Sequence, residues 1–152
     1  MDNNDVLRKI RYIFDYNDAK MIELFGFAGL KVNRSDVSNW LKQESDQSFV
    51  ELSDNKLATF LNGFIIEKRG KREGPQPIAE DILNNNIILR KIKIALDFKT
   101  DDILKMFILA DKRISESELS ALFRNPKHRK YRVCNDQYLR NFLLGIQFNQ
   151  RK

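Results

Sequence analysis

The chain has little of what metal centres, disulfide frameworks and catalytic relays are built from. Its 152 residues include one cysteine, Cys134, and one histidine, His128. A lone cysteine excludes an internal disulfide and a cysteine-rich zinc site, and a lone histidine excludes a paired-histidine metal site. No recognisable catalytic constellation is present elsewhere, so we expect no enzyme activity, no metal and no cofactor.

Long apolar runs are also absent. No stretch approaches the roughly 20 apolar residues that span a bilayer. The N-terminal sequence MDNNDVLRK is acidic and polar before its first expected helix, which is the wrong order for a secretory signal. We therefore expect a cytoplasmic protein that makes no membrane contact. With 42% hydrophobic residues, the chain has enough apolar surface for a globular core.

The sequence does contain a repeat, with a constant offset of 82 residues and no gap. LRKIRYIFDY at 7–16 is matched by LRKIKIALDF at 89–98, and SDNKLATFLNGF at 53–64 by NDQYLRNFLLGI at 135–146. A duplicated module is the direct interpretation. A copy of about 60 residues would bury only roughly 60% of its unfolded surface alone. We therefore expect the two copies to pack against each other.

Apolar spacing predicts an all-α fold. In the first expected helix, residues 3–15, Leu7, Ile10 and Phe14 fall on one face, and the second copy repeats this pattern. Capping residues predict where the later helices begin. These starts are Asn17 or Asp18, near Ser35, Ser53 or Asp54, Thr100, Ser115 with Glu118 as a capping box, and Asn135 or Asp136.

This pattern predicts two tandem homologous four-helix units. The first covers residues 1–69 and the second, strongly basic, covers residues 83–152. A basic segment with two glycines and two prolines, residues 70–82, separates them as a linker, because glycine closes a helix and proline cannot continue one. Trp40 is expected in the core of the first unit, where the second unit has Leu122.

The net charge of +6 is unevenly distributed: residues 1–80 carry −1 and residues 81–152 carry +7. The sharpest difference between the copies is the loop before the fourth helix, KQESDQSFV at 42–50 and RNPKHRKYR at 124–132. Folding alone does not require five cations in nine residues, since they repel one another. The predicted binding residues are Arg124, Lys127, His128, Arg129, Lys130, Tyr131 and Arg132.

Two interpretations of this loop remain open. In the first, the cations bind phosphate oxygens and Tyr131 offers a stacking face for a base. In the second, Tyr131 anchors the loop in the core, as the aligned Phe49 would, and the cations are solvated or paired with acids of the other copy such as Glu44 and Asp46. A secondary basic patch is predicted at Lys68, Arg69, Lys71, Arg72, Arg90, Lys91 and Lys93.

Two other patterns are less specific. Residues 20–42 and 102–124 resemble a helix-turn-helix, but the connection is longer than its tight turn and the second helix is acidic, which favours simple bundle packing. Cys134 and His128 share a loop as a nucleophile and base would. No orienting carboxylate or oxyanion donor is recognisable beside them, so structural roles are favoured.

The LRKIRY and LRKIKIAL blocks, the FLNG and FLLG motifs and the linker RGKREGPQP together resemble the YehS-like family of small, duplicated bacterial proteins, over essentially the whole chain. The resemblance implies an all-α, cytoplasmic bacterial protein and brings no activity and no catalytic residues. Charge and shape instead predict a nucleic-acid-binding or regulatory module that uses the basic second copy. The alternative is a protein-interaction adaptor with a groove between the copies, whose basic loop meets an acidic protein surface.

Overall fold

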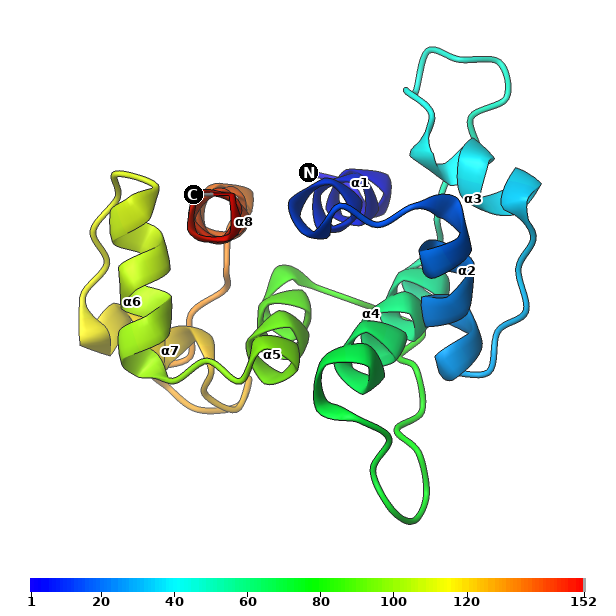
Figure 1. The fold of residues 1–152 in the computed structure, drawn as a ribbon. Coiled ribbons are helices and arrows are strands. Elements are labelled where there is room, and N and C mark those ends of the chain that lie inside the picture. Colours follow the sequence, from blue (N-terminus) through cyan, green and yellow to red (C-terminus); the bar gives the residue numbers. More distant parts are fainter. Residues whose placement is uncertain (152) are drawn as a thin grey trace. The chain divides into compact units, whose positions relative to one another are not determined.

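The computed structural model describes residues 1–151, which contain eight α-helices and no strand (Figure 1). The all-α prediction is confirmed, and the chain divides into two units with a boundary between Leu83 and Asn84. The first unit contains α1 (Asn3–Phe14), α2 (Asp18–Phe27), α3 (Arg34–Leu41) and α4 (Asp54–Arg69). The second contains α5 (Asn85–Leu96), α6 (Thr100–Leu109), α7 (Glu116–Leu122) and α8 (Asp136–Gln150).

Side-chain caps set most of the helix starts. Four predicted caps are present in the structure: Asn17 of α2, Ser53 of α4, Ser115 of α7 and Asn135 of α8. The start of α3 differs from the prediction near Ser35. Asn33 Oδ1 accepts from the Asp36 N–H at 2.8 Å and the Asp36 carboxylate accepts from the Asn33 N–H at 3.0 Å, so this reciprocal pair begins the helix at Arg34.

The cores of the two units are built from equivalent positions. Leu61 and Leu143, on the fourth helix of each unit, are 0% and 1% exposed. Trp40 is buried as predicted, with its ring centre 5.3 Å from that of Phe25. The second unit has the smaller Leu122 at that position, also buried.

Two glycines allow helices to touch through their backbones. A Cβ atom on Gly63 of α4 would overlap the Leu24 carbonyl oxygen and lie 2.7 Å from its carbonyl carbon. A Cβ on Gly145 of α8 would overlap the Met106 carbonyl oxygen and lie 2.9 Å from the Met106 Cα. Only glycine therefore permits α4 to pack this closely on α2, and α8 on α6. This explains the glycine shared by the FLNG and FLLG motifs.

A buried asparagine near the start of the first helix of each unit holds the loop before the fourth helix. Asn86 is 2% exposed, and its Nδ2 donates to the carbonyl oxygens of Leu122 and Arg132, at 2.9 Å each. Its Oδ1 accepts from the Cys134 N–H at 2.9 Å. Asn4 makes the equivalent three bonds in the first unit, to Trp40, Val50 and Leu52. Both ends of each loop are thereby tied to one side chain.

The segment after α4 returns to the other end of that helix. α4 ends at Arg69, as predicted, and Gly70 follows with a φ of 83°. Further on, the Leu83 N–H donates to Asp54 Oδ2 at 2.9 Å. Asn55 Nδ2 donates to the Ala79 carbonyl oxygen at 3.3 Å. Ala79, in the segment predicted as a linker, and Leu83, predicted as part of the second unit, are therefore bonded to the first unit.

Candidate nucleic-acid interface

Residues 124–132, here called the basic loop, have the same backbone hydrogen bonds as residues 42–50. In the basic loop the His128 N–H donates to the Asn125 carbonyl oxygen at 2.8 Å, and the Tyr131 N–H donates to the His128 carbonyl oxygen at 2.9 Å. The first unit repeats both bonds at 2.9 and 3.1 Å. The net charge of the two segments is nevertheless +5 and −1. The turn therefore forms without the cations.

His128 is a turn-forming residue as well as part of the charged cluster. Its Nδ1 accepts from the Lys130 N–H at 3.0 Å, just as Asp46 Oδ1 accepts from the Ser48 N–H at 2.8 Å. An accepting Nδ1 places the ring proton of neutral His128 on Nε2. The sequence interpretation missed this role, although the aligned Asp46 belongs to a residue type that is common in turns.

The tip of the basic loop presents cations without counter-charges. Lys127, Arg129 and Lys130 are exposed, and none of them forms an ion pair within residues 84–151 of their unit. Salt screens repulsion between exposed charges beyond about 8 Å, and these three cations lie within four consecutive residues of the chain. The tip is consequently a concentrated positive surface open to an anionic partner.

The last cation of the basic loop, Arg132, interacts with side chains of its own unit. Arg132 Nη1 lies 3.5 Å from Glu118 Oε2, and its guanidinium carbon lies 5.4 Å from the ring centre of Tyr138. Hydrogen bonds from the Ser115 backbone and hydroxyl, together with the Arg132 charge, hold the pKa of Glu118 below its usual value. Tyr131 is half-buried, as is the aligned Phe49, so part of its side chain is shielded from solvent.

Part of the predicted secondary patch borders the basic loop. Arg90 and Lys93 follow Asn86 by four and seven residues and share its face of α5. The Lys93 ammonium lies 5.0 Å from the ring centre of Phe123, which directly precedes Arg124. These two cations therefore extend the positive surface from the loop onto α5.

The remaining members of that patch lie elsewhere. Lys91 is only 8% exposed and does not belong to this surface. Lys68 lies at the end of α4 in the first unit, with its ammonium 4.6 Å from the ring centre of Phe14. Three further cations of the first unit follow it in sequence, Arg69, Lys71 and Arg72. The predicted patch is thus divided between the two units.

The Cys134 thiol is built into the core. It is 2% exposed, and burial, with a smaller effect of the nearby Asp136 charge, raises its pKa to about 12. The Sγ atom lies 3.6 Å from the Asn135 carbonyl oxygen. In the described part of the chain no hydrogen bond joins Cys134 to His128. The considered nucleophile pair is not assembled, since the thiol is neutral and the imidazole supports a turn.

We expect Cys134 to reduce stability at alkaline pH. The unfolded thiol, with an ordinary pKa near 9.0, releases a proton that the folded thiol retains up to about pH 12. The free energy of unfolding is therefore unaffected by this group below pH 9 and falls above it, by at most about 1.4 kcal/mol per pH unit. Urea unfolding between pH 8 and 11 measures this loss.

The matched variant is Cys134→Leu, because Leu52 occupies the equivalent buried position. Its stability should fall less steeply above pH 9 than that of the unmodified protein. Tyr16, whose pKa burial and the Glu67 charge raise to about 12, contributes a similar loss in both proteins. Equal slopes in the two proteins would contradict the assignment to Cys134.

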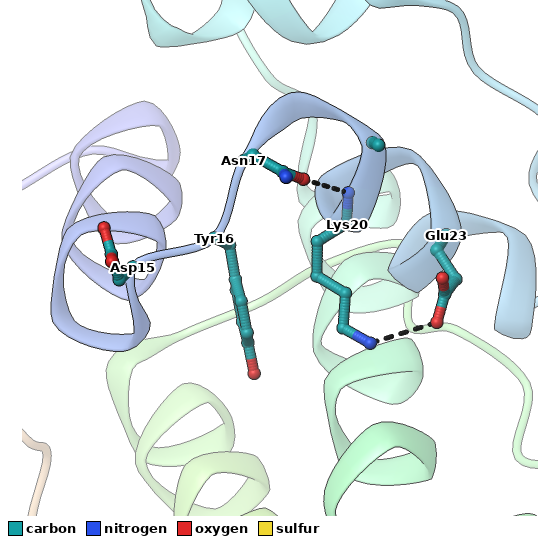
Figure 2. A pocket seen from close by; sticks show the side chains of 6 residues that line it. Asp15, Tyr16, Asn17, Lys20 and Glu23 are labelled. Atoms are coloured by element: carbon teal, nitrogen blue, oxygen red, sulfur yellow. Dashed lines mark hydrogen bonds and ion pairs between the residues drawn. The ribbon is translucent and has the colours of Figure 1, made fainter.

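A pocket of about 360 Å³ lies in the first unit, where α1 turns into α2 (Figure 2). The Tyr16 and Lys20 side chains run beside each other, and the Tyr16 hydroxyl is buried with no hydrogen-bond partner among residues 1–151. The Lys20 ammonium is paired with Glu23 at 3.0 Å and Glu67 at 2.7 Å. Its one cation is already neutralised, so this pocket is poorly suited to a phosphate.

A second pocket, of about 250 Å³, lies in the second unit between the α6–α7 connection and the start of α8. Arg132 of the basic loop contacts its wall, because Tyr138 lines the pocket. Sequence interpretation assigned none of its polar residues to a binding site. The available signal was the change of chemistry between the copies: Leu30, Lys56 and Thr59 are replaced by Lys112, Tyr138 and Asn141.

Among residues 1–151 no helix combines the length and the apolar character that crossing a membrane requires. Within the same range, no three His, Cys, Asp or Glu side chains come together as ligands for a metal ion.

Residues 3–70 and 85–152 each match the model of a family described as "Protein of unknown function (DUF1456)". The chain belongs to this family. The two matched regions coincide with the two helical units. The chain is also 39% identical over 151 residues to the "Uncharacterized protein YehS" of Escherichia coli (strain K12), which covers 99% of this chain and 97% of that protein. The resemblance seen in the repeated blocks is confirmed. No solved structure matches the chain.

Proposed function

We propose that this protein is a non-enzymatic cytoplasmic module that binds nucleic acid through the basic loop and the adjoining face of α5. The observation that carries the proposal is the pair of loops with one backbone structure and opposite net charge, −1 and +5. Since the first unit forms this loop without a cation cluster, folding does not account for the cluster. Binding of a polyanionic partner accounts for the cluster.

The positions of the charges fit phosphate binding. Lys127, Arg129 and Lys130 are exposed at the loop tip, and Arg90 and Lys93 continue the surface along α5. Cations that neutralise phosphates release condensed counterions, which favours binding at low salt whatever the base sequence. We therefore expect the loop to bind nucleic acid without distinguishing one base from another.

The contact is proposed for the loop rather than for α7 in a helix-turn-helix. The exposed positions of α7 are Glu116, Ser117 and Ser120. A recognition helix lies in the major groove between two phosphate backbones, where an exposed carboxylate is repelled. The loop has no such exposed acid, so it is the better phosphate-binding element.

The test replaces the loop tip by the residues of the first unit, Lys127→Ser, Arg129→Gln and Lys130→Ser together. These residues already occupy the same turn at Ser45, Gln47 and Ser48, so the fold should be retained. We expect at least about tenfold weaker binding at roughly 50 mM salt, and a log–log salt dependence flattened by about 0.9 per lost duplex phosphate contact. Fluorescence anisotropy with labelled oligonucleotides measures both.

A charge-matched control separates the loop from overall charge. Lys9, Lys31 and Arg34 are exposed cations of the first unit, and replacing all three by Gln removes the same net charge. This control should bind almost as well as the unmodified protein. Equal losses in both triple variants would contradict a loop site. No binding by the unmodified protein at roughly 50 mM salt would refute the proposal and favour an acidic protein as the partner of the loop.

A further inference from the structure

The pocket of the second unit combines aromatic rings with carboxamides. Phe107 and Tyr138 line it with ring centres 6.3 Å apart and planes at 82°. Gln137 and Asn141 line the same space. Aromatic rings pack against the flat faces of a nucleobase, and carboxamides offer both a donor and an acceptor to its edge. The lining therefore suits a flat heterocycle with polar edges.

Asn141 contributes an amide donor to this pocket. The residue is 7% exposed, and its Oδ1 accepts from Gln137 Nε2 at 3.0 Å. Its Nδ2 makes no hydrogen bond within the second unit as described, residues 84–151. Residues 84–151 contain no buried side-chain nitrogen without a partner, so this nitrogen is open to solvent from the pocket. An acceptor on a ligand in the pocket would satisfy this N–H.

The equivalent corner of the first unit carries different side chains. There Trp40 lies 5.3 Å from Phe25 and its ring is 5.5 Å from the Lys56 ammonium, measured to ring centres. Phe25 and Lys56 align with Phe107 and Tyr138, which line the pocket of the second unit. Leu122 in place of Trp40 leaves that corner of the second unit with a smaller side chain. Tyr138 and Asn141, in place of Lys56 and Thr59, are thus specific to the copy that carries the cations.

Cations surround the pocket. Lys112 and Arg113 line it from exposed positions, and Arg132 of the basic loop lies over the Tyr138 ring. We propose that the pocket receives one unpaired base of a single-stranded nucleic acid, while the basic loop and the two pocket cations bind the adjacent phosphates. This assignment rests on the proposed function and adds the class of nucleic acid.

Size and accessibility favour a single unpaired base. A volume of about 250 Å³ lies just below the range of roughly 300 to 1,000 Å³ for small-molecule pockets, so one base is the expected occupant. Bases in a duplex are stacked on both faces and paired along one edge, so they cannot enter without being flipped out. Single strands present unstacked bases directly. The unmodified protein should therefore bind a single strand more tightly than a duplex.

The first test compares three ligands at roughly 50 mM salt: a mixed-sequence single strand, the matching duplex, and a single strand of equal length with abasic sites in place of its central bases. The abasic strand keeps the phosphates and lacks the stacking groups. We expect it to bind about tenfold more weakly than the normal strand, because each stacked base contributes substantially to affinity. Equal affinity for both single strands would overturn the base pocket.

The second test changes the pocket to the residues of the first unit, Asn141→Thr, alone and combined with Tyr138→Lys. Both variants should lose the preference for the normal strand over the abasic strand and retain duplex binding. Retention of the full preference would overturn the assignment even if the basic loop proves essential. If no nucleic acid binds the unmodified protein, this inference fails together with the proposed function. If single strands bind through the basic loop but the abasic strand binds as tightly as the normal strand, this inference fails and the proposed function stands.

Discussion

Replacing Gly145 by Ala in α8 is expected to destabilise the second unit by about 3 kcal/mol or more. The added Cβ would overlap the Met106 carbonyl oxygen and lie 2.9 Å from the Met106 Cα, so α6 and α8 would have to separate. Backbone atoms of a helix cannot rotate away as a flexible side chain can. Gly63→Ala should destabilise the first unit in the same way, because the added Cβ would lie 2.7 Å from the Leu24 carbonyl carbon and separate α4 from α2. Urea unfolding of each variant measures the loss.

Gly26 in α2 provides a control, because its replacement by Ala is expected to raise stability and not to lower it. A Cβ at this position would meet no atom within 4 Å, and the residue is exposed. Because Ala is the better helix former, Gly26→Ala should stabilise the protein by about 0.5 to 1 kcal/mol. Ile108 already occupies the equivalent position of the second unit. Stabilisation by Gly145→Ala as well would show that the helices are not in backbone contact.

Replacing Asn86 by Leu should cost about 3 to 5 kcal/mol, because three buried backbone groups lose their partners at once. These are the carbonyl oxygens of Leu122 and Arg132 and the N–H of Cys134. A leucine of similar size fills the space and satisfies none of them. The same change should also loosen both ends of the basic loop. Amide hydrogen exchange at Cys134 reports that loosening, and urea unfolding reports the energy.

The neighbouring Asn85 gives a graded comparison. Its Nδ2 donates to the Cys134 carbonyl oxygen at 3.0 Å and to Asp136 Oδ1 at 2.8 Å, at a partly exposed position. Water can replace these bonds, so Asn85→Leu should cost only about 1 kcal/mol. If the two leucine variants were equally stable, the buried network would not be the element that secures the loop.

Features encoded over a few neighbouring residues could be predicted. The helical periodicity and the caps at Ser53, Ser115 and Asn135 depend on spacings of one to four residues, and they are present in the structure. The repeat spans a longer offset but is read directly by aligning the two copies. The start of α3 was misplaced for the same local reason. Asn33 and Ser35 are both good capping residues two positions apart, and the reciprocal bond from Asp36 decides between them.

Features that depend on distant partners could not be predicted. The paired asparagines at the start of each copy are visible in the sequence, but Asn86 bonds to backbone groups 36 to 48 residues away. The glycines of the FLNG and FLLG motifs likewise gain their importance from a carbonyl on another helix. No local pattern identifies such partners, because the folded chain brings them together.

The candidate site divides in the same way. The charge of the basic loop is a property of composition, and alignment of the copies alone showed that residues 42–50 lack it. The turn bond of His128 is local, since it reaches the residue two positions on. Burial of Lys91 and pairing of Arg132 with Glu118 were settled only by tertiary structure. So was the pocket beside Tyr138, because a cavity exists only where side chains from separate segments leave space unfilled.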